Sequence, residues 1–344
     1  MQEKQYKIAF APLQGYTDFI YRRLHAAHFS GVNTYYTPFL RLPKRNKDVK
    51  NVALENNDVN LVVPQIIGGD ADEMNYWLNY LQDLGYQRVD LNFGCPFRLI
   101  AGKGRGSGRF KELDKFESLL QHLPSNLDIS LKLRLGWDSP QQLLNLMPCI
   151  NAVPLNSIAV HARLGVQDYK GTTDLDSFEQ IYANCVPPLY YNGDITTVQE
   201  AQQILTRFPD LAGLMIGRGL LADPDLARKI VHTFTQEVAS MSTVLLSDAA
   251  PDSPSTPIQA RSQQMAASIS DNHPYALYRA FHDQLLKEYS THLEGGDAQI
   301  LQKMKSIWDY FLPHVDKRIR KKIIKTKRLS DYPSHASMAF SSSL

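Results

Sequence analysis

The chain has 344 residues, of which 43% are hydrophobic and 21% are charged, and its formal net charge is +2. This is an ordinary composition for a soluble globular protein, and the length suits one barrel-sized domain plus a smaller one. The N-terminus lacks the apolar run of a signal peptide, and no apolar stretch is long enough to span a membrane. Three cysteines without paired spacing predict no metal site and no disulfide framework, so we expect a cytoplasmic protein.

Short apolar or β-branched runs alternate with longer helical patterns over residues 1–239. The predicted strands are Lys7–Leu13, Thr34–Phe39, Leu61–Ile67, Arg88–Leu91, Ile129–Leu133, Ser157–Val160, Leu189–Tyr191 and Gly213–Ile216. The predicted helices are Phe19–His28, Lys44–Leu54, Asp72–Leu84, Glu112–His122, Pro140–Asn151, Asp176–Ala183, Thr197–Arg207 and Pro224–Val238. Eight such units close into a (β/α)8 TIM barrel more readily than into any other fold, so we expect an α/β barrel.

A different composition follows the predicted barrel. Residues 240–272 are rich in Ser, Pro, Ala and Asp, which predicts a flexible linker. Residues 273–328 return to helical periodicity, so we expect a small α-helical C-terminal domain. We expect the tail over 329–344 to be disordered.

Positive charge is concentrated in three clusters. Residues 317–328 hold eight of the 37 basic residues and no acidic residue, which leaves 29 basic against 35 acidic residues elsewhere. The other two clusters follow predicted strands and comprise Arg41, Lys44, Arg45, Lys47 and Lys50, and Arg98, Lys103, Arg105, Arg109 and Lys111. One charge run is usually a solvated helix face, but three together favour a polyanionic partner.

The stretch DLNFGCP, from Asp90 to Pro96, leaves one thiol at the end of a predicted strand. A barrel keeps its chemistry at the carboxyl ends of its strands, which favours a catalytic Cys95. The alternative is that Cys95 is a small buried hydrophobic residue, as most free cysteines are.

Polar side chains at the other strand ends should converge on the same cavity. In chain order these ends carry Pro12, Leu13 and Gln14; Arg41; Gln65; Asn92; Lys132 and Arg134; His161 and Arg163; Asn192, Gly193 and Asp194; and Gly217 and Arg218. Charged groups are rarely buried without a partner, so this set is difficult to explain as packing.

The last two strand ends, NGD at 192–194 and GRG at 217–219, predict a phosphate site. Barrels often bind phosphate there through backbone N–H groups, and Arg218 adds a positive charge. Lys132 could form a Schiff base or stabilise negative charge on a flavin, and His161 could be a general base, a cofactor contact or a rim residue. The glycine-rich GKGRGSG from Gly102 does not fit a P-loop, so we expect a mobile loop that can lie over a substrate.

Seven motifs in this order resemble those of the tRNA-dihydrouridine synthases, flavoenzymes that reduce uridine in the D-loop of tRNA. The motifs are APLQGYTD, VPQIIGGDADEM, DLNFGCP, LKLRLGWD, VHARLGVQDYKG, YYNGDI and LMIGRG, and they cover roughly the first 225 residues. The later segment KMKSIWDYF is similar, less specifically, to the family's C-terminal RNA-binding domain.

The resemblance implies a monomeric enzyme with FMN at the barrel mouth and NADPH as reductant. Reduced FMN would give hydride to uracil C6, and Cys95 would give a proton to C5. The implied cofactor contacts are Pro12, Leu13, Gln14, Gln65, Lys132, His161, Asn192, Gly193, Asp194, Gly217 and Arg218. The expected tRNA contacts are Asn92, Arg134, Arg163, Arg98, Arg105, Arg109, Arg320, Lys321 and Lys322.

Three other functions stay open on the residues. The chain could be a flavin barrel that acts on a free small molecule, such as a dihydroorotate-type or ene-type reductase, although the basic run at 317–328 argues against this. It could be a flavin-free, aldolase-like barrel with Lys132 as nucleophile. It could also bind RNA without catalysis, which the presence of Cys95, Lys132 and His161 disfavours.

Overall fold

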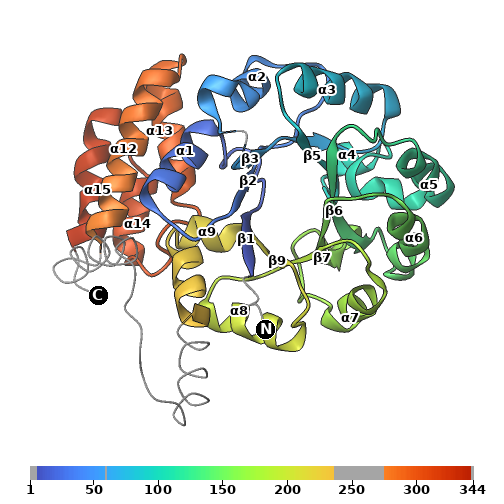
Figure 1. The fold of residues 1–344 in the computed structure, drawn as a ribbon. Coiled ribbons are helices and arrows are strands. Elements are labelled where there is room, and N and C mark those ends of the chain that lie inside the picture. The colour runs from blue at the N-terminus through green and yellow to red at the C-terminus, as the bar shows by residue number, and fades with distance from the viewer. Residues whose placement is uncertain (1–5, 59, 236–274, 342–344) are drawn as a thin grey trace, which may run out of the picture. The chain divides into compact units, whose positions relative to one another are not determined.

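A closed parallel barrel forms the first part of the protein (Figure 1). The computed structural model describes residues 6–58, 60–235 and 275–341, and the chain divides into two units, Met1–Arg228 and Lys229–Leu344. The predicted linker over 240–272 lies outside the described residues, as does the part of the predicted helix 224–238 beyond residue 235. Within those described ranges, no helix combines the length and the apolar character that crossing a membrane requires.

The barrel sheet contains nine parallel strands. They are β1 (Lys7–Phe10), β2 (Thr34–Tyr36), β3 (Val62–Val63), β4 (Gln65–Ile67), β5 (Arg88–Phe93), β6 (Asp128–Gly136), β7 (Ser157–Leu164), β8 (Leu189–Asn192) and β9 (Gly213–Ile216). Their order is β3-β2-β1-β9-β8-β7-β6-β5-β4, so the two end strands are neighbours in the chain, separated only by Pro64. Proline has no N–H for the ladder, which explains why the predicted strand Leu61–Ile67 is divided. The predicted α/β barrel is confirmed.

Helices surround the barrel in the ribbon view (Figure 1). They are α1 (Phe19–His28), α2 (Asn46–Val52), α3 (Ala71–Asp83), α4 (Arg98–Ala101), α5 (Leu113–Gln121), α6 (Gln141–Ala152), α7 (Leu175–Asn184), α8 (Val198–Arg207) and α9 (Arg218–Ala222). Short 3-10 turns are η1 (Leu54–Asn56), η2 (Gly106–Lys111) and η3 (Gly165–Gln167). Several helices begin where a side chain accepts a backbone N–H, as Asp18 does for α1, Asp70 for α3 and Thr197 for α8.

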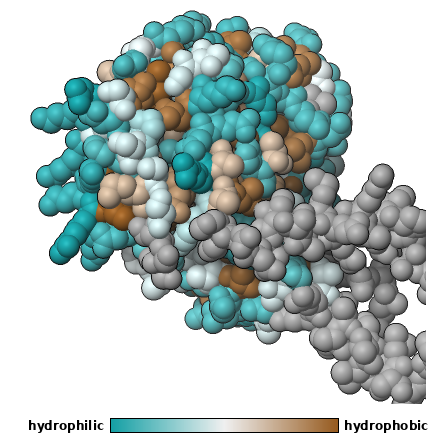
Figure 2. Space-filling view, turned by 90° about the vertical axis from the view of Figure 1, so that its left-hand side faces the viewer, coloured by the Kyte–Doolittle hydropathy of each residue, from teal (hydrophilic) through white to brown (hydrophobic). Residues whose placement is uncertain are grey.

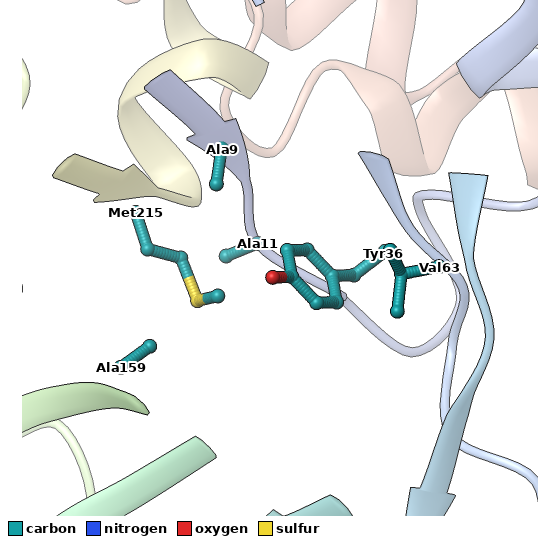
Figure 3. Close-up of a cluster of buried hydrophobic side chains, with 6 residues drawn as sticks. All are labelled: Ala9, Ala11, Tyr36, Val63, Ala159 and Met215. Atoms are coloured by element: carbon teal, nitrogen blue, oxygen red, sulfur yellow. The ribbon is translucent and has the colours of Figure 1, made fainter. Parts of the chain in front are cut away.

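Small side chains leave space inside the barrel for two larger ones. Ala9, Ala11 and Ala159 are buried around Tyr36 and Met215 in one apolar cluster, together with Val63. Figure 3 shows the Tyr36 ring extending from β2 into the interior, with its hydroxyl directed toward the side of Met215. This cluster fills the interior with packed side chains, as in other eight-unit barrels.

The second unit is helical, as predicted. Its described elements are α12 (Ala276–His292), α13 (Gly296–Ile307), α14 (Lys317–Ile324), η4 (Leu329–Asp331) and α15 (Tyr332–Ser341).

The face of the molecule in Figure 2 carries mostly hydrophilic residues, with hydrophobic residues in small groups between them, which is ordinary for a protein surface.

The prediction of a disordered tail over 329–344 is wrong for residues 329–341. Tyr332, Ala336, Ala339 and Phe340 recur at helical spacing and are buried. The Tyr332 hydroxyl accepts a hydrogen bond from Trp308 Nε1 at 2.7 Å, which attaches α15 to the end of α13. Two of these four buried residues are alanines, so the apolar face was weak in the sequence.

Candidate active site

Neighbouring strands bring the predicted polar residues into register at the carboxyl end of the barrel. Asn92 of β5 pairs with Lys132 of β6, and Arg134 of β6 pairs with His161 of β7. His161 in turn pairs with Asn192 of β8. Because parallel strands end at the same edge of the sheet, these side chains form one group.

The Cys95 turn is held by hydrogen bonds on both sides. Asn92 Oδ1 accepts the backbone N–H of Gly94 at 2.9 Å and of Cys95 at 2.8 Å. Ser107 donates to the Cys95 carbonyl through both its backbone N–H and its hydroxyl, each at 3.0 Å. The thiol is only partly exposed, and burial raises its pKa above the ordinary value. Cys95 is therefore protonated near neutral pH, as a proton donor needs to be.

Lys132 is held by the next pair of strands. Its Nζ donates to Asn192 Oδ1 at 2.8 Å, while Asn192 Nδ2 donates to the carbonyl of Met215 at 2.7 Å. Burial, followed by the positive charge of Arg134, lowers the pKa of Lys132 to about 8. The lysine is a cation at neutral pH, but it loses its charge at a pH only slightly higher.

His161 is a buried neutral imidazole. Burial lowers its pKa well below the ordinary value, and the charges of Arg134, Lys132 and Arg163 lower it further. Arg163 Nη1 lies 3.2 Å from His161 Nε2, and a guanidinium can only donate. Nε2 is thus the acceptor, and the ring proton is on Nδ1. A neutral imidazole of this kind can donate a hydrogen bond from Nδ1, but it is not a charged acid.

Asp194 holds two arginines at the predicted phosphate site. Its carboxylate accepts from Arg163 Nη1 at 3.0 Å and from Arg218 Nη2 at 2.7 Å. Burial alone would raise the pKa of Asp194, but the two guanidinium groups lower it below the ordinary value. Arg163 is 2% exposed, whereas Arg218 is 36% exposed. Arg218 is therefore the more accessible of the two cations, and the Asp194 side chain, expected to contact the cofactor, is bonded to both arginines.

Two glycines lie at the predicted phosphate site, and one of them, Gly193, packs closely against the side chain of Thr173. Gly193 has a φ of +148°, and a Cβ there would lie 2.8 Å from Thr173 Cγ2. Gly217 ends β9 immediately before Arg218 and α9. Two glycine turns beside an accessible guanidinium and a lysine are a donor set that fits a phosphate monoester attached to an electron-rich group.

The residues expected to line a flavin ring differ in their exposure to solvent. Pro12 and Leu13 are half-buried, and the Leu13 N–H donates to Thr17 Oγ1 at 2.9 Å. Gln14 is exposed, and its Nε2 donates to the carbonyl of Phe39 at 3.0 Å. Gln65 is fully buried, and its side-chain amide bonds to Asp90 and Asn92.

Several arginines expected to face RNA bind protein groups instead. Arg105 forms an ion pair with Glu73 at 2.7 Å, and Arg109 pairs with Glu112 at 3.2 Å and donates to the Gly69 carbonyl. The loop that carries them is packed, not free over the mouth, because Gly108 lies so close to Ala101 that a Cβ would be 2.1 Å from its carbonyl oxygen.

Arg134 and Arg320 also serve the protein. Arg134 is 1% exposed, and it donates to the Gly94 carbonyl at 3.0 Å and to the Leu164 carbonyl at 2.7 Å. It thereby connects the Cys95 turn to the end of β7. Arg320 donates to the carbonyls of Trp308 and Phe311 in the segment that follows α13. Of the basic residues in the expected RNA contact set, Arg98, Lys321 and Lys322 have exposed side chains.

Sequence reasoning missed three residues of this site. Asp90 lies two positions before Asn92, so strand alternation could have placed both on the same face. Tyr169 lies 4.9 Å from Arg218 and 5.4 Å from Arg134, measured from its ring centre to each guanidinium carbon. Ser107 was assigned to a mobile loop, and no sequence pattern marks its contact with Cys95.

Comparisons with known proteins agree on one family. The sequence model described as "Dihydrouridine synthase (Dus)" matches residues 9–305. A protein of Rickettsia conorii named "Probable tRNA-dihydrouridine synthase" is 27% identical over 65% of this chain and 69% of its own length. A Shigella flexneri protein named "tRNA-dihydrouridine(16) synthase" is 28% identical over 66% of this chain and 76% of its own.

Shorter and more distant similarities accompany these matches. A Pseudomonas syringae protein named "tRNA-dihydrouridine synthase B" is 31% identical over 49% of this chain and 50% of its own length. The solved structure of an old yellow enzyme homologue from Zymomonas mobilis is 14% identical, with a TM-score of 0.47, over 66% of this chain and 88% of its own.

Proposed function

Because this chain belongs to the dihydrouridine synthase family, we propose that it is an oxidoreductase that reduces the C5–C6 bond of a uridine in the D-loop of tRNA. We propose FMN as its cofactor and NADPH as the reductant. The observation that carries the proposal is a partly buried thiol, whose pKa burial raises, within one strand-end group that also contains Lys132, Asn192 and the predicted glycine–arginine phosphate site.

The residues of the anion site fit FMN. Arg218 and the turns at Gly193 and Gly217 would hold the phosphate. Lys132 would face the part of the ring that becomes negative, and neutral His161 would donate from Nδ1. Bound and reduced FMN would supply the hydride that goes to uracil C6.

The proposed reduction also needs a proton, and Cys95 carries one on Sγ. It would transfer this proton to uracil C5, and solvent would return a proton to the thiolate afterwards. The Asn92 and Ser107 hydrogen bonds fix the turn on both sides, so the thiol is presented in one position. Positioned proton transfer of this kind contributes about 10² to 10⁴ in rate.

Recognition of tRNA would use the exposed residues at the mouth and on α14. Phe97 is 59% exposed, two positions after Cys95, and a nucleobase could stack on it. The target uridine has to leave its stack, which costs a few kcal/mol. Phosphate contacts from Arg98, Lys321 and Lys322 would offset this cost and make binding depend on salt.

The test is a reconstituted reaction with the purified protein, FMN, NADPH and an unmodified tRNA transcript. Dihydrouridine is measured by nucleoside mass spectrometry. We expect Cys95→Ala to lower the rate by about 100-fold or more, since it removes the positioned acid. Cys149→Ala is the matched control and should keep the rate. A Cys95→Ala enzyme as fast as the wild type would remove the proton-donor role, and a wild type without product would remove the substrate assignment.

A further inference from the structure

Asp90 is a buried carboxylate that the proposed reaction does not use. It is 1% exposed, and it lies on β5 in register with Gln65 of β4 and Ser130 of β6. Ser130 Oγ donates to one carboxylate oxygen at 2.7 Å, and Gln65 Nε2 donates to the other at 2.6 Å. A buried charge is costly unless it is hydrogen-bonded, so the carboxylate favours the state in which both donors are in place.

From Gln65 the hydrogen bonds continue to the reactive turn. Asn92 Nδ2 donates to Gln65 Oε1 at 2.8 Å, and Asn92 Oδ1 accepts the N–H groups of Gly94 and Cys95. Each side-chain amide has a donor end and an acceptor end, so the orientation of one determines the orientation of the next.

The carboxylate determines which way round the two side-chain amides of this series are oriented. An ionised carboxylate can only accept, so Gln65 turns its NH2 group toward Asp90 and its oxygen toward Asn92. Asn92 then donates to Gln65, which leaves its oxygen for the two backbone N–H groups of the turn. Gln65 and Asn92 are both buried, so solvent offers little replacement for a lost partner.

We propose that Asp90 is a positioning residue that sets the conformation of the Cys95 turn through the side chains of Gln65 and Asn92. The proposal rests on the proposed function in so far as Cys95 is the proton donor there. With the turn in this conformation the thiol is partly buried, and burial raises its pKa. Asp90 thus acts on the acid without touching it or the substrate.

The test measures how fast iodoacetamide alkylates Cys95 in the full-length protein across a pH series, with peptide mass spectrometry as the readout. We expect Asp90→Ala to release the turn and expose the thiol. Each unit by which the thiol pKa falls raises its reactive thiolate fraction near neutral pH about tenfold. Cys149 in the same chain is the internal control and should react at the wild-type rate.

A conservative variant separates positioning from a general structural role. Asp90→Asn keeps an oxygen that can accept from Gln65, and the Ser130 hydroxyl can accept from its new NH2 group. We therefore expect Asp90→Asn to restore wild-type alkylation of Cys95. A folded Asp90→Ala protein with a wild-type alkylation rate at Cys95 would overturn the proposal.

A second variant keeps the test decisive if Asp90→Ala does not fold. Gln65→Met interrupts the series at its middle and should raise Cys95 reactivity in the same direction. The double variant should react no faster than the more reactive single one, and multiplied effects would contradict a shared route. Alkylation needs no turnover, so a failed dihydrouridine assay would overturn the proposed function without affecting this inference.

Discussion

Burial shifts the pKa values of two side chains of the candidate site, Cys95 and Lys132, in opposite directions. It raises the pKa of the Cys95 thiol and lowers the pKa of Lys132 to about 8, because in each case it favours the neutral form. The thiol consequently retains its proton over the physiological range. The lysine keeps its charge at neutral pH and loses it as the pH rises through about 8.

The state of Lys132 leads to a prediction for cofactor binding. If Lys132 stabilises negative charge on the flavin, FMN affinity should fall as the pH rises through about 8, where the lysine loses its charge. Lys132→Met should bind FMN about tenfold more weakly at neutral pH, since a hydrogen bond to a charged group is lost. Its affinity should not change across the same pH range. Quenching of FMN fluorescence measures both, and a shared pH dependence would contradict this role.

Asp194 should matter for stability as well as for the anion site. Asp194→Ala leaves the buried Arg163 without its carboxylate, so we expect the free energy of unfolding to fall by about 2 kcal/mol, reduced by the partial exposure of Asp194. Asp176→Ala removes an exposed partner of Arg207, and it should leave the free energy of unfolding unchanged. Urea-induced unfolding distinguishes the two, and equal effects would contradict the argument.

The pH dependence of the Asp194 effect has a definite sign. The folded state lowers the pKa of Asp194, so its stabilisation is present above the unfolded pKa and is lost as the pH falls through the folded one. The stability difference between wild type and Asp194→Ala should therefore be full at neutral pH. It should shrink below about pH 4, where the unfolded carboxyl begins to bind a proton.

Helix α14 carries two kinds of basic residue, some exposed to solvent and one bonded to the protein itself. Lys321 and Lys322 are exposed on this helix, whereas Arg320 donates to carbonyl groups in the segment that follows α13. These three cations are consecutive in the sequence, so charge alone could not distinguish them. Successive residues of a helix point in directions about 100° apart, which directs one toward the protein and the others toward solvent.

This difference can be tested in tRNA binding. Replacing Lys321 and Lys322 with Gln should reduce the slope of log affinity against log salt by about 1 to 2, because each phosphate contact releases counterions. The thermal stability of the protein should not change. Arg320→Gln should instead lower thermal stability, since it removes the donors to the Trp308 and Phe311 carbonyls. An unchanged salt slope in the lysine variant would exclude α14 from the RNA contact surface.

The elements also show what could be predicted from sequence. Strands and helices of the barrel followed from apolar periodicity, and the side chains of Asp18, Asp70 and Thr197 accept backbone N–H groups at the starts of α1, α3 and α8. The partners of Arg105, Arg134 and Arg163 could not be predicted, because Glu73, the Gly94 carbonyl and Asp194 become neighbours only after folding. Helix α15 was missed because small residues form much of its buried face.

At the scale of the whole molecule, two units divide the chain's functional features. The barrel carries Cys95, Lys132 and the proposed anion site, while the unit from Lys229 onward carries the exposed cations of α14. The family match runs from residue 9 to residue 305, so it extends from the barrel into the helical unit. A polyanionic substrate with one reactive base would require both sets of features.

The most direct test is nucleoside mass spectrometry of tRNA from a strain that lacks this gene, compared with strains complemented by wild type or by Cys95→Ala. We predict that dihydrouridine disappears from one D-loop position, returns with the wild-type gene and does not return with Cys95→Ala. Unchanged dihydrouridine at every position in the deletion strain, in a background without other dihydrouridine synthases, would contradict the proposed function.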